Sequence, residues 1–247
     1  MKSQTKQELF NDEEEKLLTR PANQLLNDFG AGKASPGSGS AAALLALLSS
    51  KMIYTVCSIS LTKQECSEHH VQFKFICKQV EENIVPKLKE LFEKDARDFE
   101  QVVRLRVSRD NASDKTEKSN YSRKSLDLLQ TATDYTFEVA NSALTLMEYG
   151  IGIFNNGWHA IRGDSGVSIS AAMSAVMSSI FIINLNLKTL KRRKYARENL
   201  KRVQELQKKL EELQTRAFSC VSSLSQESLA SIQLELKNEN RTKENTD

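Results

Sequence analysis

Residues 34–62 read ASPGSGSAAALLALLSSKMIYTVCSISLT, a glycine- and serine-rich turn followed by a long segment that carries a single charge. Gly37 and Gly39 allow the backbone to approach another group closely, and Ser38 or Ser40 could cap the first turn of a helix. A loop of this kind before a helix presents unpaired N–H groups and the positive end of the helix dipole. The stretch therefore predicts either the capped start of a buried helix or a cradle for an anionic or polar ligand.

Helices are predicted along almost the whole chain. Its 247 residues include only 9 glycines and 3 prolines, with 27% charged residues, which is typical of long helices rather than of a many-turned β fold. Apolar residues recur at helical spacing, and no segment alternates convincingly as a strand. The predicted helices cover residues 21–29, 40–61, 65–107, 122–154 and 165–187, with a further one beyond Thr189. We therefore expect an all-α fold, a bundle of long antiparallel helices.

Two interruptions are expected in this pattern. Pro86 falls within residues 65–107. An interior proline removes a backbone hydrogen bond and costs about 3 kcal/mol, so the helix either bends there or a new helix starts. Residues 108–121, SRDNASDKTEKSNY, are predicted to form a polar loop.

The last helix carries a narrow apolar seam on an otherwise charged surface. Apolar residues alternate by three and four positions, at Val203, Leu206, Leu210, Leu213, Ala217, Cys220 and Leu224. This spacing predicts packing of one face on the bundle or on a second subunit. We expect a polar lead-in at residues 1–20, a single helical domain at residues 21–236 and a disordered tail at residues 237–247.

Charge and cysteine content narrow the class of protein. The formal net charge of +3 does not favour a dedicated nucleic-acid binder. The four cysteines have no CxxC spacing and no histidine placed to complete a zinc pattern. The polar, acidic N-terminus has no apolar signal core, so we expect a cytoplasmic protein with reduced thiols.

The uncharged segment Ser165–Leu187 is long enough to cross a bilayer. However, it contains six serines and two asparagines, and the mean hydropathy of the chain is −0.46. A helix without charges can also form the centre of a soluble bundle. We favour this second interpretation and expect no membrane partner.

Asp95 is anomalous within its predicted helix. At 100° per residue, it falls within the same arc of about 60° as Leu88, Phe92 and Phe99. A carboxylate directed toward a core must find a partner, shift its pKa or line a cavity. Asp95 is thus a candidate site residue, with a buried cap or ion pair as the alternative.

Three stretches together resemble one family. PGSGSAAALLALL at residues 36–48, LFEKDARDF at 91–99 and NNGWHAIRGDSGVSISAAMSAVMSSIFIINLNL at 155–187 are similar to motifs of the formiminotransferase-cyclodeaminase C-terminal family, in the same order. That family includes stand-alone methenyltetrahydrofolate cyclohydrolases. The resemblance implies a cyclodeaminase-like helical fold and a folate-dependent enzyme acting on C–N bonds, with tetrahydrofolate as carrier and neither a metal nor a redox cofactor.

The resemblance also suggests a site. The catalytic carboxylates would be Asp164 and Asp95, and the substrate-binding residues Gly37, Ser38, Gly39, Ser40, His159, Arg162 and Asn186. Alternatives remain for three of them. Asp164 also suits a helix N-cap, His159 could be an ordinary loop histidine, and Arg162 could pair with a folate glutamate or with a neighbouring aspartate.

The chain departs from the family motifs at several positions. Ser38 stands where the family has glycine, Gly163 where it has serine, and Ile182 where it has asparagine. Two other interpretations therefore stay open. One is a diverged enzyme acting on a non-folate amidine or imine, and the other is a non-catalytic helical dimer that serves as a scaffold.

The length of the uncharged helix constrains how its two ends can contribute. Asp164 and Asn186 are 22 residues apart, which is about 33 Å on a straight helix. They cannot share a pocket within one subunit unless the helix breaks, but the helix ends of two antiparallel subunits can meet. We therefore predict a homodimer whose sites could form between subunits.

Overall fold

The computed structural model describes residues 16–244, and the side chains through Lys237. No strand occurs in this range, which confirms the all-α prediction. The helices are α1 (Ala22–Gly30), α2 (Ser38–Ser60), α3 (His70–Gln79), α4 (Val85–Asn111), α5 (Lys115–Asn156), α6 (Arg162–Thr189) and α7 (Lys194–Glu244).

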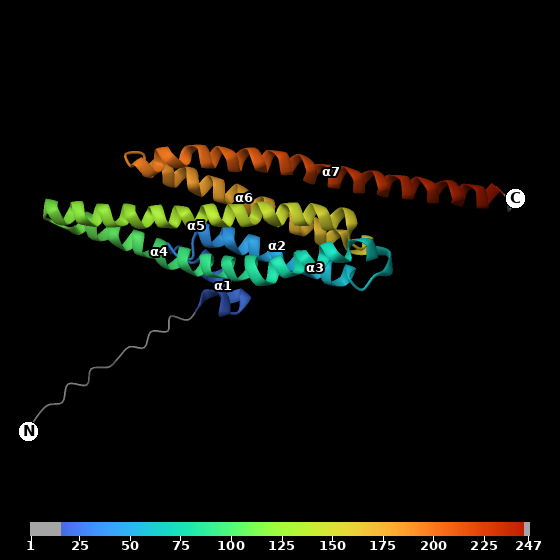
Figure 1. Ribbon diagram of the computed structural model, residues 1–247, viewed down its shortest axis with the longest axis horizontal. Coiled ribbons are helices and arrows are strands. Elements are labelled where there is room, and N and C mark those ends of the chain that lie inside the picture. Colours follow the sequence, from blue (N-terminus) through green and yellow to red (C-terminus); the bar gives the residue numbers. More distant parts are fainter. Residues whose placement is uncertain (1–15, 245–247) are drawn as a thin grey trace, which may run out of the picture.

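The long helices lie side by side as a bundle (Figure 1). Helix α2 is central and contacts α4, α5 and α6. Its alanines at positions 42, 43 and 46 are fully buried, and such small side chains let neighbouring helices approach closely. The hydroxyl of Ser49 donates to the carbonyl oxygen of Ser168 on α6 at 2.8 Å, which fixes the two helices together.

The segment around Pro86 combines the two expected outcomes. A π-helical turn, Val80–Ile84, joins α3 to α4, and Pro86 lies in the first turn of α4. The proline therefore sits where its missing N–H costs little.

The polar loop predicted at residues 108–121 is wrong. Helix α4 continues to Asn111, and α5 begins at Lys115 with Asp114 as its N-cap. The Asp114 carboxylate accepts hydrogen bonds from the N–H groups of Thr116 and Glu117 at 2.8 and 2.9 Å. A capped helix with an exposed polar surface needs no apolar face, so composition alone was misleading here.

Helices α2 and α6 are each long and apolar enough to cross a membrane by length and composition alone. Within the fold, both are members of the bundle, and α6 packs on α2, α5 and α7. One face of α6 remains exposed, however, and it carries Val167, Met177, Phe181 and Leu185.

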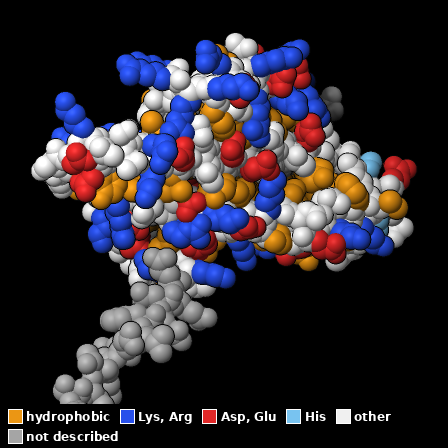
Figure 2. All heavy atoms as spheres, turned by 60° about the vertical axis from the view of Figure 1, so that its left-hand side comes forward, with side chains coloured by type: hydrophobic (Ala, Val, Ile, Leu, Met, Phe, Trp, Pro, Cys, Tyr) orange, Lys and Arg blue, Asp and Glu red, His pale blue; other side chains and the backbone are white. Residues whose placement is uncertain are grey.

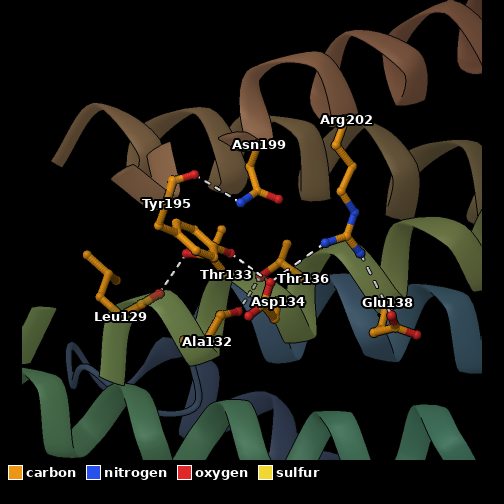
Figure 3. A network of polar contacts seen from close by, with 9 residues as sticks. All are labelled: Leu129, Ala132, Thr133, Asp134, Thr136, Glu138, Tyr195, Asn199 and Arg202. Carbon is orange, nitrogen blue, oxygen red and sulfur yellow. Dashed lines mark hydrogen bonds and ion pairs between the residues drawn. The ribbon is translucent and has the colours of Figure 1, made fainter. Parts of the chain in front are cut away.

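Helix α7 is attached to α5 by a polar network (Figure 3). The hydroxyl of Tyr195 donates to Asp134 at 2.7 Å. The guanidinium of Arg202 lies 3.7 Å from Asp134, 3.8 Å from Glu138 and 3.9 Å from the ring centre of Phe137. These contacts hold the first third of α7 on the bundle.

The predicted seam of α7 is buried from Val203 to Cys220, whereas Leu224 is exposed. Glu227 of α7 still pairs with Arg162 of α6, and only the last part of α7 extends past the end of the bundle (Figure 1). It continues to Glu244, through most of the segment for which a disordered tail was expected. Residues 245–247, and residues 1–15 of the expected lead-in, lie outside the described part of the chain.

Candidate functional site

A pocket of about 550 Å³ opens between the start of α2, the middle of α4 and the end of α6. Four of the predicted site residues line it. They are Ser38, Gly39, Asp95 and Asn186. The remaining lining residues are Phe99, Arg106, Leu129, Ala132, Ile182, Leu185, Lys188, Thr189 and Lys191.

Asp95 lies against the N-terminus of α2. The hydroxyl of Ser40 donates to Asp95 Oδ2 at 3.1 Å and lies 3.3 Å from the carbonyl oxygen of Phe92. The backbone N–H of Ser40 also donates to the Asp95 carboxylate. Asp95 therefore occupies the anion position that a helix N-terminus creates.

Gly39 is required by this packing. A Cβ at position 39 would lie 2.5 Å from Asp95 Cγ and would overlap both carboxylate oxygens. The glycine motif thus makes room for the carboxylate of this chain, rather than leaving the helix start open.

The pKa of Asp95 is raised to about 6, chiefly because burial removes water from the carboxylate. The two hydrogen bonds from Ser40 oppose this increase, and the nearby charge of Asp98 adds to it. A carboxyl group with such a pKa can accept a proton at neutral pH and return it, as general acid–base catalysis requires.

Cationic side chains also line the pocket. Arg106 is half-buried, and burial lowers the pKa of its guanidinium. Lys188 and Lys191 are exposed at the end of α6 and the turn that follows. Figure 2 brings this end of the bundle forward and shows many Lys and Arg side chains, with acidic and apolar ones between them. The pocket therefore combines one buried acid with several bases.

Sequence reasoning missed these three basic residues. Arg106 follows Asp95 by eleven positions, about three helical turns, so both lie on the same face of α4. That spacing could have revealed it.

The expected capping roles are wrong. The N-cap of α2 is Gly37, which makes no side-chain cap bond, and Ser38 and Ser40 lie within the first turn. Asp164 likewise lies in the first turn of α6, whose N-cap is Ile161, and no side chain caps this helix. The hydroxyl of Ser40 binds Asp95 instead, and Asp164 is left available for another role.

Asp164, Arg162 and His159 lie at the other end of α6, outside the Asp95 pocket. Arg162 pairs with Glu227 of α7 at 2.6 Å and lies 3.1 Å from His159 Nε2. Because α6 is one unbroken helix, a single chain does not bring Asp164 to Asn186 or to Asp95.

The formiminotransferase-cyclodeaminase family model matches residues 21–205. The chain belongs to this family. All nine residues of the predicted site, and every lining residue of the Asp95 pocket, fall within the matched segment. The later part of α7 lies beyond it.

Relatives of this formiminotransferase-cyclodeaminase family member are distant. A methenyltetrahydrofolate cyclohydrolase from Methylorubrum extorquens is 24% identical over 205 residues, which cover 81% of this chain and 97% of the relative. The crystal structure of formiminotetrahydrofolate cyclodeaminase from Thermotoga maritima matches with a TM-score of 0.71 and 16% identity. The structural match covers 84% of this chain and 99% of the Thermotoga maritima chain, which confirms the cyclodeaminase fold.

Proposed function

We propose that this protein hydrolyses a C–N bond of a folate-bound one-carbon group, as a methenyltetrahydrofolate cyclohydrolase does. The observation that carries the proposal is Asp95, a buried carboxyl group with a pKa of about 6 in a pocket lined by the family's glycine-serine turn. The methenyltetrahydrofolate cyclohydrolase to which the chain is similar adds support, because the match covers nearly all of that relative.

Hydrolysis of the methenyl group needs a carboxylate beside the bridging carbon. The methenyl bridge is an amidinium cation, so the negative charge of Asp95 stabilises it in the pocket. Water adds to the bridging carbon while Asp95 accepts the released proton. Asp95 then returns the proton to the departing nitrogen as the C–N bond breaks, while the added hydroxyl loses its own proton to water and becomes the formyl carbonyl. The net result is the addition of one water molecule and the release of one proton, so the cation becomes a neutral formyl product.

The basic side chains of the pocket suit the glutamate part of a folate, which is anionic. Arg106, Lys188 and Lys191 bring positive charge to the pocket, where the glutamate carboxylates of a folate could pair with them. Asn186 and the first turn of α2 offer hydrogen bonds to polar edges of the ligand.

The exposed face of α6 supports a homodimer, and we propose that this dimer is cytoplasmic. Val167, Met177, Phe181 and Leu185 leave an apolar stripe in water that a second copy could cover. If the two α6 helices pack antiparallel about a two-fold axis, Asp164 of one subunit lies opposite Asn186 of the other. Each pocket then contains Asp95 of its own chain and Asp164 of the partner.

Cyclodeamination of a formimino group is the second candidate, favoured by the structural likeness to a formiminotetrahydrofolate cyclodeaminase. That reaction passes through a similar tetrahedral carbon and expels ammonia. Release of ammonia from formiminotetrahydrofolate, measured alongside loss of methenyltetrahydrofolate absorbance, separates the two activities.

Mixing two inactive variants tests the shared site. Asp95→Asn and Asp164→Asn should each lose most of the turnover of methenyltetrahydrofolate followed by absorbance. In a mixed dimer, one of the two pockets regains both aspartates, so the mixture should recover about a quarter of wild-type activity. Each variant alone, at the same total concentration, is the control.

Three results would count against the proposal. An active Asp164→Asn, or inactivity of the mixture despite exchange of subunits, would remove Asp164 from the site. Failure of the wild-type protein to bind any folate derivative would favour a non-folate substrate. If neither Asp95→Asn nor Asp164→Asn changed any cellular function of the protein, a scaffold role would be favoured.

A further inference from the structure

A second hollow lies between α6 and α7, away from the Asp95 pocket. This α6–α7 groove has a volume of about 420 Å³. Its walls are mainly apolar and comprise Phe154, Arg162, Gly163, Gly166, Ile169, Ser170, Met173, Ala217, Phe218, Cys220, Val221, Leu224, Ser225 and Ser228. All of the α7 residues in the groove lie beyond residue 205, where the family match ends.

The α7 wall of the groove exposes apolar surface. Phe218 is 56% exposed and Val221 is 64% exposed, although each is adjacent to a buried residue of the seam, Ala217 or Cys220. At one end, the ion pair between Arg162 and Glu227 joins the two walls. The groove is thus a hollow on the surface whose two walls are joined by an ion pair.

The second half of α6 presents side chains that suit such a hollow. Phe181 is 68% exposed and Leu185 is 64% exposed, on the same face of the helix. Exposed aromatic and leucine side chains at helical spacing are typical anchors of a helix that docks in an apolar groove.

We propose that Phe181 and Leu185 of a second copy of this chain occupy the α6–α7 groove, so that the extension of α7 clasps the partner subunit. The register of the antiparallel pair leads to this assignment. Ala175 lies midway between Asp164 and Asn186, and Phe181 and Ile169 lie equally far on either side of it. Phe181 of one copy therefore falls opposite Ile169, a groove residue, of the other.

Charge complementarity supports the antiparallel orientation. The groove end of α6 carries Asp164, and the charge of Arg162 is already matched by Glu227. The other end carries Lys188 and, just after the helix, Lys191. Between Asp164 and Lys188 the helix has no charge, so an antiparallel pair places acid against base at both ends of an uncharged contact.

This inference rests on the antiparallel dimer proposed above, but not on the folate chemistry. It assigns a purpose to the part of α7 that lies outside the family match. The clasp adds contacts on both sides of the two-fold axis, because each copy supplies one groove and one pair of anchors.

Sedimentation velocity of the full-length protein over nanomolar to micromolar concentrations tests the clasp. Phe181→Glu should weaken dimerisation about 100-fold, because it places a charge in an apolar groove. Val221→Glu, on the opposite wall, should weaken it about 10-fold. Val71→Glu is the matched control, since Val71 is 82% exposed on α3, and it should leave the dimer unchanged. All four proteins should keep the same helical circular dichroism.

Other occupants give different results. A wild-type dimer that Val221→Glu leaves unchanged would overturn the clasp while the dimer itself stands. Binding of the dye anilinonaphthalene sulfonate to the wild-type dimer, abolished by Val221→Glu, would assign the groove to a small apolar ligand. A wild-type monomer that floats with phosphatidylcholine vesicles would assign the face to a membrane. A dimer with an intact clasp and no folate turnover would sustain this inference and reject only the proposed function.

Discussion

Asp95 and Asp164 were both expected in one site, yet the fold treats them differently. Asp95 of α4 is buried against the start of α2, where it accepts a hydrogen bond from Ser40 of the same chain. Asp164 is half-buried in the first turn of α6, beside a face that no part of the described chain covers. An acid inside an apolar stripe is organised by a single subunit. In the proposed dimer, Asp164 would gain the rest of its surroundings from the second subunit.

The largest expected effect follows from removing the organised acid. Asp95→Asn should lower kcat for methenyltetrahydrofolate by at least about 100-fold, because the general base is lost while the shape of the side chain is kept. The same substitution should increase stability at neutral pH, since it removes a buried charge. A variant that is inactive because it unfolds would contradict this account.

The pH dependence of stability checks the same point. The pKa of Asp95 is about 6 in the folded protein against an ordinary 3.8, so the folded state binds this proton more tightly than the unfolded state does. The free energy of unfolding should therefore fall as pH rises from about 4 to about 6, by roughly 3 kcal/mol at most. Urea unfolding should show Asp95→Asn to be stabilising at pH 7 and nearly neutral at pH 4.

A smaller effect is expected from crowding the same acid. Gly39→Ala should reduce turnover about 10-fold or more, because the new methyl group must displace the Asp95 carboxylate. Gly30→Ala, at the end of α1, is the matched control, since a Cβ there meets nothing within 4 Å and Gly30 lines neither the pocket nor the groove. Equal rates for the two variants would show that the packing of Gly39 on Asp95 does not matter.

The smallest expected effect is a change in the pKa of Asp95. Ser40→Ala removes a hydrogen bond that favours the charged form, so the pKa of Asp95 should rise further. The acidic limb of the kcat/KM profile should move to higher pH by up to about one unit. Ser49→Ala, which removes a buried hydroxyl from the same helix, should change stability without moving that limb.

Local patterns were enough to predict the helical fold and the unusual environment of Asp95. Helical spacing revealed the bundle, and the position of Asp95 among Leu88, Phe92 and Phe99 indicated a buried carboxylate. The same reasoning failed at residues 108–121, because an exposed helix needs only a cap such as Asp114 and no apolar stripe.

The basic side chains of the pocket and the α6–α7 groove could not be predicted from the sequence, because both depend on tertiary contacts. Arg106 and Lys191 line one pocket only because α4 and the end of α6 both border the start of α2, which no local pattern encodes. The groove depends on where α7 diverges from the bundle after its buried seam. Sequence spacing predicted the seam but not the hollow beside it.

The contact between Gly39 and Asp95 also limits how this molecule can evolve. The carboxylate fills the volume that any larger residue at position 39 would need. Position 39 is not free to change while Asp95 keeps its present side chain, so a lineage that abandons the acid is the first in which the glycine can change.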